Sequence, residues 1–297
     1  MKGRKDCPRC QGRGVVFDPD PLKPARRCDC ASEGGSDAAE AGLPARYREA
    51  DFARFWKWWN NAHAPEIKSS LEQLPELERA AAAPELLRDV LGQGDPGELV
   101  RLIQATRKKP EHGIRPAGAE ALAQWATTGR HRFRQGWELW WIHGPAQSGR
   151  SSLAAAALRA WGERTGRSVR YVSVRALSQS IKDAYYDVRS FQNQAFQSVR
   201  DLIEPLETPG LLVLDDWDRM DTDVRVAAAL AQLLDHRYAE ELPTVLTATV
   251  PPEGLERREG HPLVRLEDAS LLGRLRGAER VEMVPALRPW LDRLARP

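Results

Sequence analysis

The sequence predicts an α/β fold with a five-stranded parallel sheet, because short apolar runs alternate with segments of helical pattern in its C-terminal half. The runs expected to form strands are 139–143, 169–174, 211–215, 244–249 and 280–284. Two of them lead into motif residues, a glycine-bearing loop after the first and a pair of acids closing the third.

Composition divides the 297 residues into four parts. Residues 1–30 contain all four cysteines, and residues 31–42 are small and polar, which predicts a flexible linker. Residues 43–136 are rich in helix formers and predict a lead-in and helical region, and residues 137–297 form the α/β domain. A hydrophobic fraction of 42% supports a buried core and excludes a disordered chain.

The net charge of +2 excludes a polycation that coats nucleic acid by overall charge alone. Residues 1–30 are locally basic, with eight Lys or Arg and four Asp, a net charge of +4. No apolar run is long enough to span a bilayer, and the basic N-terminus lacks the apolar segment of a secretory signal. We therefore expect a cytoplasmic protein without membrane contact.

The first strand leads into a loop that matches the phosphate-binding pattern G-x-x-x-x-G-K-[ST], with arginine in place of lysine. In such a loop, backbone N–H groups at the positive end of the following helix surround the phosphates of a nucleotide. The Ser151 hydroxyl is expected to bind Mg²⁺. The predicted nucleotide-binding residues are Gly144, Pro145, Ala146, Gln147, Ser148, Gly149, Arg150, Ser151, Ser152 and Asp215.

Two residues depart from this pattern. The guanidinium of Arg150 keeps the positive charge but is larger than an ammonium, so it cannot take the same compact position between β- and γ-phosphates without adjustment. Gln147 stands where such loops usually have a further glycine. Both departures favour a protein that has lost hydrolysis.

A second motif follows about 60 residues later, where the apolar run LLVLD ends in two acids. Asp215 is predicted to hold Mg²⁺, directly or through water, and Asp216 to orient the attacking water. The alternative interpretation is that paired acids simply end a strand. Two motifs on strand–helix units at plausible spacing favour nucleotide binding.

Three segments resemble the DnaC/DnaI helicase loaders and the related IstB transposition ATPases of the AAA+ class. These are the lead-in AGLPARYREADFARF, the segment HRYAEELPTVLTATV and the ending DASLLGRLRGAERVEMV. The resemblance covers residues 1–59 and about 137–297, and it implies an AAA+ P-loop fold, ATP and Mg²⁺ as cofactors, and self-association through AAA+ interfaces.

The resemblance also implies roles for single residues. Arg274 matches the arginine finger that reaches the nucleotide of a neighbouring subunit, and Thr249 matches the sensor 1 asparagine with a shorter side chain. Arg288 is a further candidate sensor in the C-terminal tail. The alternative for either arginine is a solvated surface charge.

The cysteines form the spacing Cys7-x-x-Cys10 and Cys28-x-Cys30. Four thiolates suit a closed, tetrahedral and therefore structural Zn²⁺ site, and the alternatives are a redox cluster or no metal. In helicase loaders such an N-terminal module grips the replicative helicase, which makes that helicase the expected partner.

Single-stranded DNA is the second expected partner, because bases stack on aromatic rings while basic groups follow the backbone. By resemblance, the candidates are Lys182, Tyr185, Tyr186 and Arg189. The aromatic run DFARFWKWWN at 51–60 is interpreted either as a contact surface or as core packing.

Three hypotheses remain open from the residues and the resemblance. The first is an ATPase that loads or regulates a replicative helicase on single-stranded DNA during DNA replication. The second is a hydrolysis-deficient nucleotide-binding adaptor, favoured by Arg150, Gln147 and Thr249. The third is an IstB-like transposition regulator.

Overall fold

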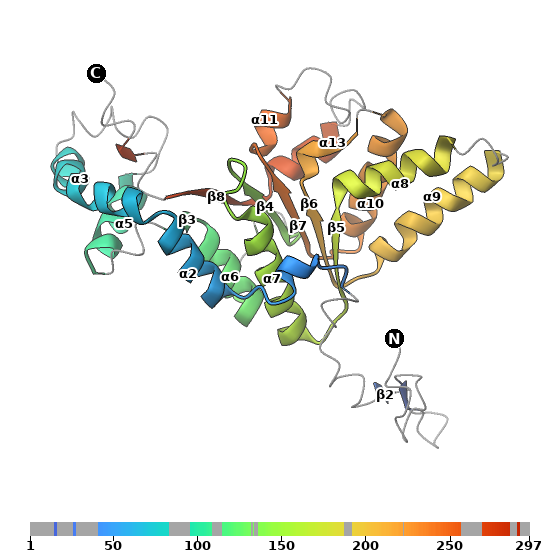
Figure 1. The fold of residues 1–297 in the computed structure, drawn as a ribbon, viewed down its shortest axis with the longest axis horizontal. Helices are drawn as coiled ribbons and strands as arrows, with labels where there is room; N and C mark the ends of the chain where they lie inside the picture. Colours follow the sequence, from blue (N-terminus) through green and yellow to red (C-terminus); the bar gives the residue numbers. More distant parts are fainter. Residues whose placement is uncertain are drawn as a thin grey trace.

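The computed structural model describes residues 15–16, 26–27, 41–82, 96–108, 115–131, 133, 136–186, 192–221, 223–256, 269–285 and 290–291. Its main feature is a six-stranded sheet in the order β3-β8-β4-β7-β6-β5 (Figure 1). The strands are β3 (Pro116–Ala117), β4 (Leu139–His143), β5 (Val169–Ser173), β6 (Leu211–Asp215), β7 (Thr244–Ala248) and β8 (Glu279–Pro285).

The five strands predicted from the sequence all form, and they pair in parallel. The prediction of only five strands is wrong, because β3 adds an antiparallel edge strand against β8. This strand is two residues long, too short to produce an apolar pattern that a sequence could reveal. The helix α8 (Val174–Tyr186) begins at the residue that was predicted to end the preceding strand.

Helices cover both faces of the sheet. One buried cluster joins the sheet to α2 (Phe52–Ala62), α6 (Ala119–Thr128) and α7 (Arg150–Thr165). The other joins it to α8, α9 (Gln192–Glu207), α10 (Val224–Ala239) and α13 (Ala269–Arg276). The neighbours Trp140 and Trp141 in β4 belong to different clusters, because successive side chains of a strand point to opposite faces.

The lead-in to α2 runs along the edge of the sheet. The Tyr171 N–H of edge strand β5 donates to the carbonyl oxygen of Ala41 over 2.6 Å. Gly42 follows at φ 77°, and a Cβ there would lie 2.7 Å from the Tyr171 carbonyl oxygen, so the close approach requires glycine. The short helix η1 (Ala45–Tyr47) then leads the chain to α2.

The aromatic run in α2 is mainly core packing. Phe55 and Trp59 are buried against α7 and the sheet, whereas Trp58 keeps 42% of its surface exposed. Asp51 caps the helix by accepting a hydrogen bond from the Arg54 N–H over 2.7 Å. The helix therefore presents one exposed tryptophan beside the glycine-bearing loop.

A separate helical lobe follows α2, at the left of Figure 1. It consists of α3 (Ala64–Ala82) and α5 (Pro96–Lys108), and the tail residues Trp290 and Leu291 pack into it. Its core also contains Leu74, Leu77, Ala80, Leu99 and Ile103. The lobe thus links the helical region to the end of the chain.

Near the N-terminus, β1 (Val15–Val16) pairs antiparallel with β2 (Arg26–Arg27). The predicted zinc ligands Cys7, Cys10, Cys28 and Cys30 lie outside the described residues, as do Arg189 and Arg288. The zinc site therefore stays a prediction. Among the helices that the structure describes, none is long and apolar enough to cross a membrane.

Candidate nucleotide-binding site

The glycine-bearing loop joins the end of β4 to the start of α7, as the motif predicts. A Cβ at Gly144 would lie 2.7 Å from the Met283 Cβ, and a Cβ at Gly149 would collide with the Trp58 ring. Gly149 also has φ 87° as the N-cap of α7. Gln147 takes φ 63°, so the backbone adopts the conformation for which a glycine is usual, at the conformational cost of a side chain.

The start of α7 opens into a cavity of about 520 Å³. The free N–H groups of a helix N-terminus and the positive end of its dipole favour an anion there. The lining of the cavity comprises Arg46, Tyr47, Trp58, Ala146, Gln147, Ser148, Gly149, Arg150, Ser151, Ser152, Asp216 and Arg219. Most of the residues predicted from the loop motif therefore lie around one space.

The two predicted magnesium ligands are brought together from different elements. The Ser151 hydroxyl at the start of α7 donates to Asp215 Oδ1 at the end of β6 over 2.8 Å. Hydroxyl and carboxylate oxygens are hard donors, and Mg²⁺ normally takes one or two protein ligands and completes its shell with water and phosphate. This pair beside the cavity fits Mg²⁺.

Thr247 in β7 is a site residue that the sequence did not reveal. Its hydroxyl donates to Asp215 Oδ1 over 2.6 Å and accepts the Asp216 N–H over 2.9 Å. Its side chain is fully buried. The sequence offered little signal, because Thr247 is one of two threonines in the strand TVLTA and no motif marks it.

Arg150 lies inside the loop instead of pointing to solvent. Its guanidinium donates to the Gly144 carbonyl oxygen over 2.6 Å and pairs with Asp216 Oδ1 at 3.4 Å. Burial raises the pKa of Asp216, and the charge of Asp215 raises it further, while Arg219 and Arg150 act in the opposite direction. The guanidinium is therefore an internal counterion of the second acid.

The Tyr171 hydroxyl lies below the site. It is buried and has no hydrogen-bond partner among the described residues, and the ring is 3% exposed. Burial raises the pKa of Tyr171, and the Asp215 carboxylate raises it further, while Ser151 lowers it. The Tyr47 ring, which lines the cavity, lies 6.2 Å from the Tyr171 ring between centroids.

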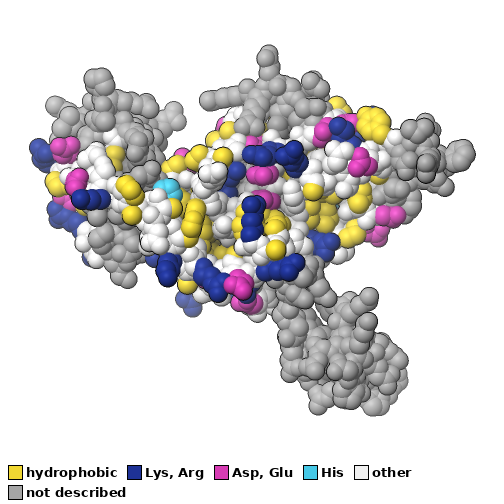
Figure 2. Space-filling view, viewed as in Figure 1, with side chains coloured by type: hydrophobic (Ala, Val, Ile, Leu, Met, Phe, Trp, Pro, Cys, Tyr) yellow, Lys and Arg dark blue, Asp and Glu magenta, His cyan; other side chains and the backbone are white. Residues whose placement is uncertain are grey.

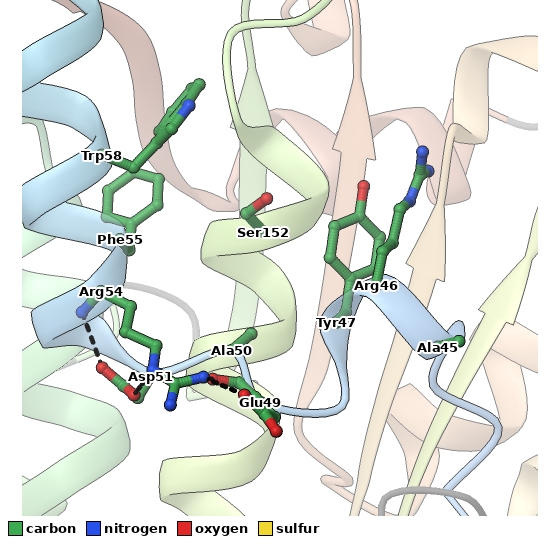
Figure 3. A pocket seen from close by; sticks show the side chains of 10 residues that line it. All are labelled: Ala45, Arg46, Tyr47, Glu49, Ala50, Asp51, Arg54, Phe55, Trp58 and Ser152. Carbon is green, nitrogen blue, oxygen red and sulfur yellow. Dashed lines mark hydrogen bonds and ion pairs between the residues drawn. The ribbon is translucent and has the colours of Figure 1, made fainter.

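A second cavity of about 310 Å³ adjoins the first, and four residues line both: Arg46, Tyr47, Trp58 and Ser152. Figure 3 shows Trp58 with Phe55 on one side of Ser152, and Tyr47 with Arg46 on the other. Arg54, Asp51 and Glu49 lie at its lower edge in this view. Motif matching finds only the phosphate loop, so this aromatic side was missed.

The residues predicted by resemblance lie further away. Thr249 follows β7 and donates to the Asp218 carboxylate. Arg274 in α13 pairs with Asp235 of α10 and stacks over the Tyr238 ring at 4.1 Å. Neither residue lines the cavity of its own chain. A finger that acts on a neighbouring subunit need not do so, and both roles stay predictions.

The described DNA candidates lie on α8. Lys182 pairs with Asp221 at 3.0 Å, and the Tyr186 hydroxyl donates to Asp223 over 2.8 Å. Tyr185 is partly buried against the core. Figure 2 shows basic side chains interspersed with acidic ones on this face. The contact with DNA stays a prediction.

Residues 138–264 match the family model of IstB-like ATP binding proteins. The predicted resemblance to IstB-like ATPases is confirmed over these residues. The fold is α/β, with a six-stranded sheet that is parallel except for β3. No curated protein matches the chain.

Several solved structures are similar at 18–19% identity. The match to DnaI covers 64% of this chain and 86% of that chain at 18% identity, with a TM-score of 0.42. The match to a putative primosome component from Streptococcus pyogenes serotype M3 covers 57% and 79% at 19% identity, with a TM-score of 0.43. The match to AMPPCP-bound DnaA from Aquifex aeolicus covers 56% of this chain at 18% identity and a TM-score of 0.43, but only 45% of that chain.

Proposed function

We propose that this chain binds Mg²⁺-ATP as an AAA+ protein and loads or regulates a replicative DNA helicase on single-stranded DNA. The observation that carries the proposal is the contact of 2.8 Å between the Ser151 hydroxyl and Asp215 Oδ1. Ser151 directly follows the glycine-bearing loop and lines the 520 Å³ cavity. A carboxylate and a hydroxyl at a helix N-terminus form a site for a cation next to a site for an anion.

Residues of the glycine-bearing loop and of β6 would have different roles at the phosphates of the nucleotide. The backbone N–H groups at the start of α7 would bind phosphate oxygens, and Ser151 and Asp215 would hold Mg²⁺, which would neutralise the negative charge of the phosphates. Arg150 exchanges Asp216 for a phosphate oxygen, since its guanidinium already lies at the cavity. Released from Arg150, the Asp216 carboxylate orients water.

The nucleotide base fits the adjoining 310 Å³ cavity. Trp58 and Tyr47 line both cavities and present aromatic rings on either side of Ser152 (Figure 3). Stacking of a base on an aromatic side chain contributes about 1–3 kcal/mol. Trp58→Ala should therefore weaken ATP binding at least fivefold and leave binding of inorganic triphosphate unchanged.

The biological partners in this proposal rest on the family resemblance. The N-terminal four-cysteine module binds the helicase, single-stranded DNA contacts the α8 region, and Arg274 completes the site of a neighbouring copy. For Arg274 to do so, it must leave Asp235 and the Tyr238 ring.

A hydrolysis-deficient adaptor is the second candidate function. It is favoured by the pairing of Arg150 with Asp216, which occupies the acid that would orient water. A transposition regulator is the third, favoured by the family match at residues 138–264. A transposase gene beside this one would support that third candidate.

The test is equilibrium binding and turnover by the full-length protein. We expect ATP binding that tightens with Mg²⁺ and weakens in Asp215→Asn. Hydrolysis in the presence of single-stranded DNA and helicase supports the loader, whereas binding without turnover supports the adaptor. Failure to bind ATP at millimolar concentration would contradict both.

A further inference from the structure

Asp215 ends β6, between the neighbouring strands β7 and β5, which carry Thr247 and Tyr171. The strand β6 pairs with β7 on one side and with β5 on the other. Thr247 follows the paired residue Leu246 in β7, and Tyr171 faces Val213, two residues before Asp215. Because side chains alternate along a strand, Tyr171, Val213 and Asp215 share one face of the sheet.

The hydroxyl of Thr247 connects the two acids. It donates to Asp215 Oδ1 and accepts the Asp216 N–H, at 2.6 and 2.9 Å. Asp216 has φ 57°, a conformation that a non-glycine residue holds only when its surroundings stabilise it. Thr247 therefore fixes the side chain of the first acid and the backbone turn of the second.

The hydroxyl of Tyr171 is close enough to Asp215 to be affected by it, but it makes no hydrogen bond of normal geometry to a described residue. It is buried and has no hydrogen-bond partner among the described residues, which is uncommon for a buried polar group. Burial raises the pKa of Tyr171 most, the Asp215 carboxylate and Tyr47 raise it further, and the Ser151 hydroxyl lowers it, so Asp215 and Ser151 lie close to this hydroxyl. A phenylalanine would fill the same space without an unpaired hydroxyl, so packing alone does not account for tyrosine.

We propose that Thr247 and Tyr171 are the positioning residues of Asp215 for Mg²⁺. The proposal deepens the proposed nucleotide-binding function and rests on it. Asp215 Oδ1 now accepts from both Ser151 and Thr247. With Mg²⁺ bound, Ser151 would coordinate it through a lone pair of its oxygen, and the hydroxyls of Thr247 and Tyr171 would hold the Asp215 carboxylate in place beside it.

The test compares the full-length protein with Tyr171→Phe, Thr247→Val and Thr247→Ser. The first two changes remove a hydroxyl at nearly constant shape, and the third keeps the hydroxyl. Thr106→Val is the matched control, because Thr106 is a buried threonine of the distant helix α5 and donates to the Leu102 carbonyl oxygen over 2.7 Å. Calorimetry measures ATP affinity in EDTA and over a Mg²⁺ titration, and thermal melting measures stability.

For Tyr171→Phe we expect an unchanged ATP affinity in EDTA, an unchanged or higher Tm, and a Mg²⁺ half-saturation about tenfold higher, since a hydrogen bond to a charged group is lost. Thr247→Val should raise the Mg²⁺ half-saturation at least as much and should lower the Tm. Thr247→Ser, which keeps the hydroxyl, should bring both values most of the way back to those of the wild type. Thr106→Val should titrate like the wild type.

Two outcomes separate the possible failures. If the wild type binds Mg²⁺-ATP and both hydroxyl-deleted variants titrate with the wild-type half-saturation, the positioning role is overturned while nucleotide binding stands. A loss of Tm with no change in the Mg²⁺ titration also overturns the positioning role, because it reports packing alone. If the wild type binds no ATP with or without Mg²⁺, the proposed function is wrong, and the positioning role, which depends on it, is wrong as well.

Discussion

The pairing of Arg150 with Asp216 predicts that ATP must displace an internal ion pair, and a double-mutant cycle measures this cost. The guanidinium and the carboxylate lie 3.4 Å apart, with side-chain exposures of 7% and 28%. At an effective dielectric constant of about 20, such a pair gains on the order of 5 kcal/mol before desolvation. Measured couplings between contacting residues are about 0.5–3 kcal/mol.

We therefore expect Asp216→Asn to tighten ATP binding by about 5–30-fold, which corresponds to about 1–2 kcal/mol. Arg150→Ala should weaken binding about 10–100-fold, because a charge-assisted bond to phosphate contributes about 1.5–3 kcal/mol. In the Arg150→Ala background, Asp216→Asn should gain much less, since only its repulsion toward phosphate remains to be relieved.

The assay is isothermal calorimetry with Mg²⁺-ATP on the wild type, both single variants and the double variant. Asp216→Asn is also expected to abolish hydrolysis, so its titration reports binding alone. Arg150→Lys, which keeps the charge, is the control and should bind ATP better than Arg150→Ala. Additivity of the two changes within about 0.5 kcal/mol would refute the reasoning, because independent sites add within that range.

Four further outcomes are expected. Gly149→Ala should lower both Tm and ATP affinity, because Gly149 has φ 87° and an added Cβ would collide with the Trp58 ring. The double variant Gly149→Ala/Trp58→Ala should recover part of the lost Tm. If it recovers none, the collision is not the cause. Arg237→Met should lower the free energy of unfolding in urea by at least about 3 kcal/mol. The fully buried Arg237 guanidinium donates to four carbonyl oxygens and one hydroxyl, and these acceptors would lose their donor. A smaller loss would show that water replaces the guanidinium. Any turnover should fall with acid at a higher pH than for an ordinary carboxyl, because Asp216 has a raised pKa and becomes protonated at higher pH. The dependence of kcat/KM on pH, which reports groups of the free protein, checks this. Cys28→Ser should release zinc, as measured by metal analysis, and weaken helicase binding while ATP affinity stays nearly intact; equal loss of both would contradict a separable module.

The pH effect on folding has a defined sign. The folded pKa of Asp216 is raised above its unfolded value, mainly by burial. Its contribution to stability is therefore fully present below the unfolded pKa and is lost as pH rises through the folded pKa. Asp216→Asn removes this contribution, so the Tm of the variant minus that of the wild type should increase with pH across the acidic range.

Local patterns were enough to place the parallel strands and both motifs. Each strand is a short apolar run with its own boundaries, and each motif directly follows a strand in the sequence. Ser151 and Asp215 could therefore be predicted as site residues from the sequence, and the structure then showed their contact. The motif marked position 147 as one where a glycine is usual. Only the structure shows that Gln147 holds the corresponding backbone conformation, with φ 63°.

What the sequence by itself determined is the order of strands and helices and the chemistry of the loop and the acids, because these depend on neighbouring residues. Only the tertiary structure decided which distant residues join them: Thr247 and Tyr171 at Asp215, Trp58 and Tyr47 beside the loop, and β3 at the edge of the sheet. Such contacts depend on how strands are ordered and helices docked across long sequence separations. A threonine in a mostly apolar strand does not show which carboxylate lies on the neighbouring strand.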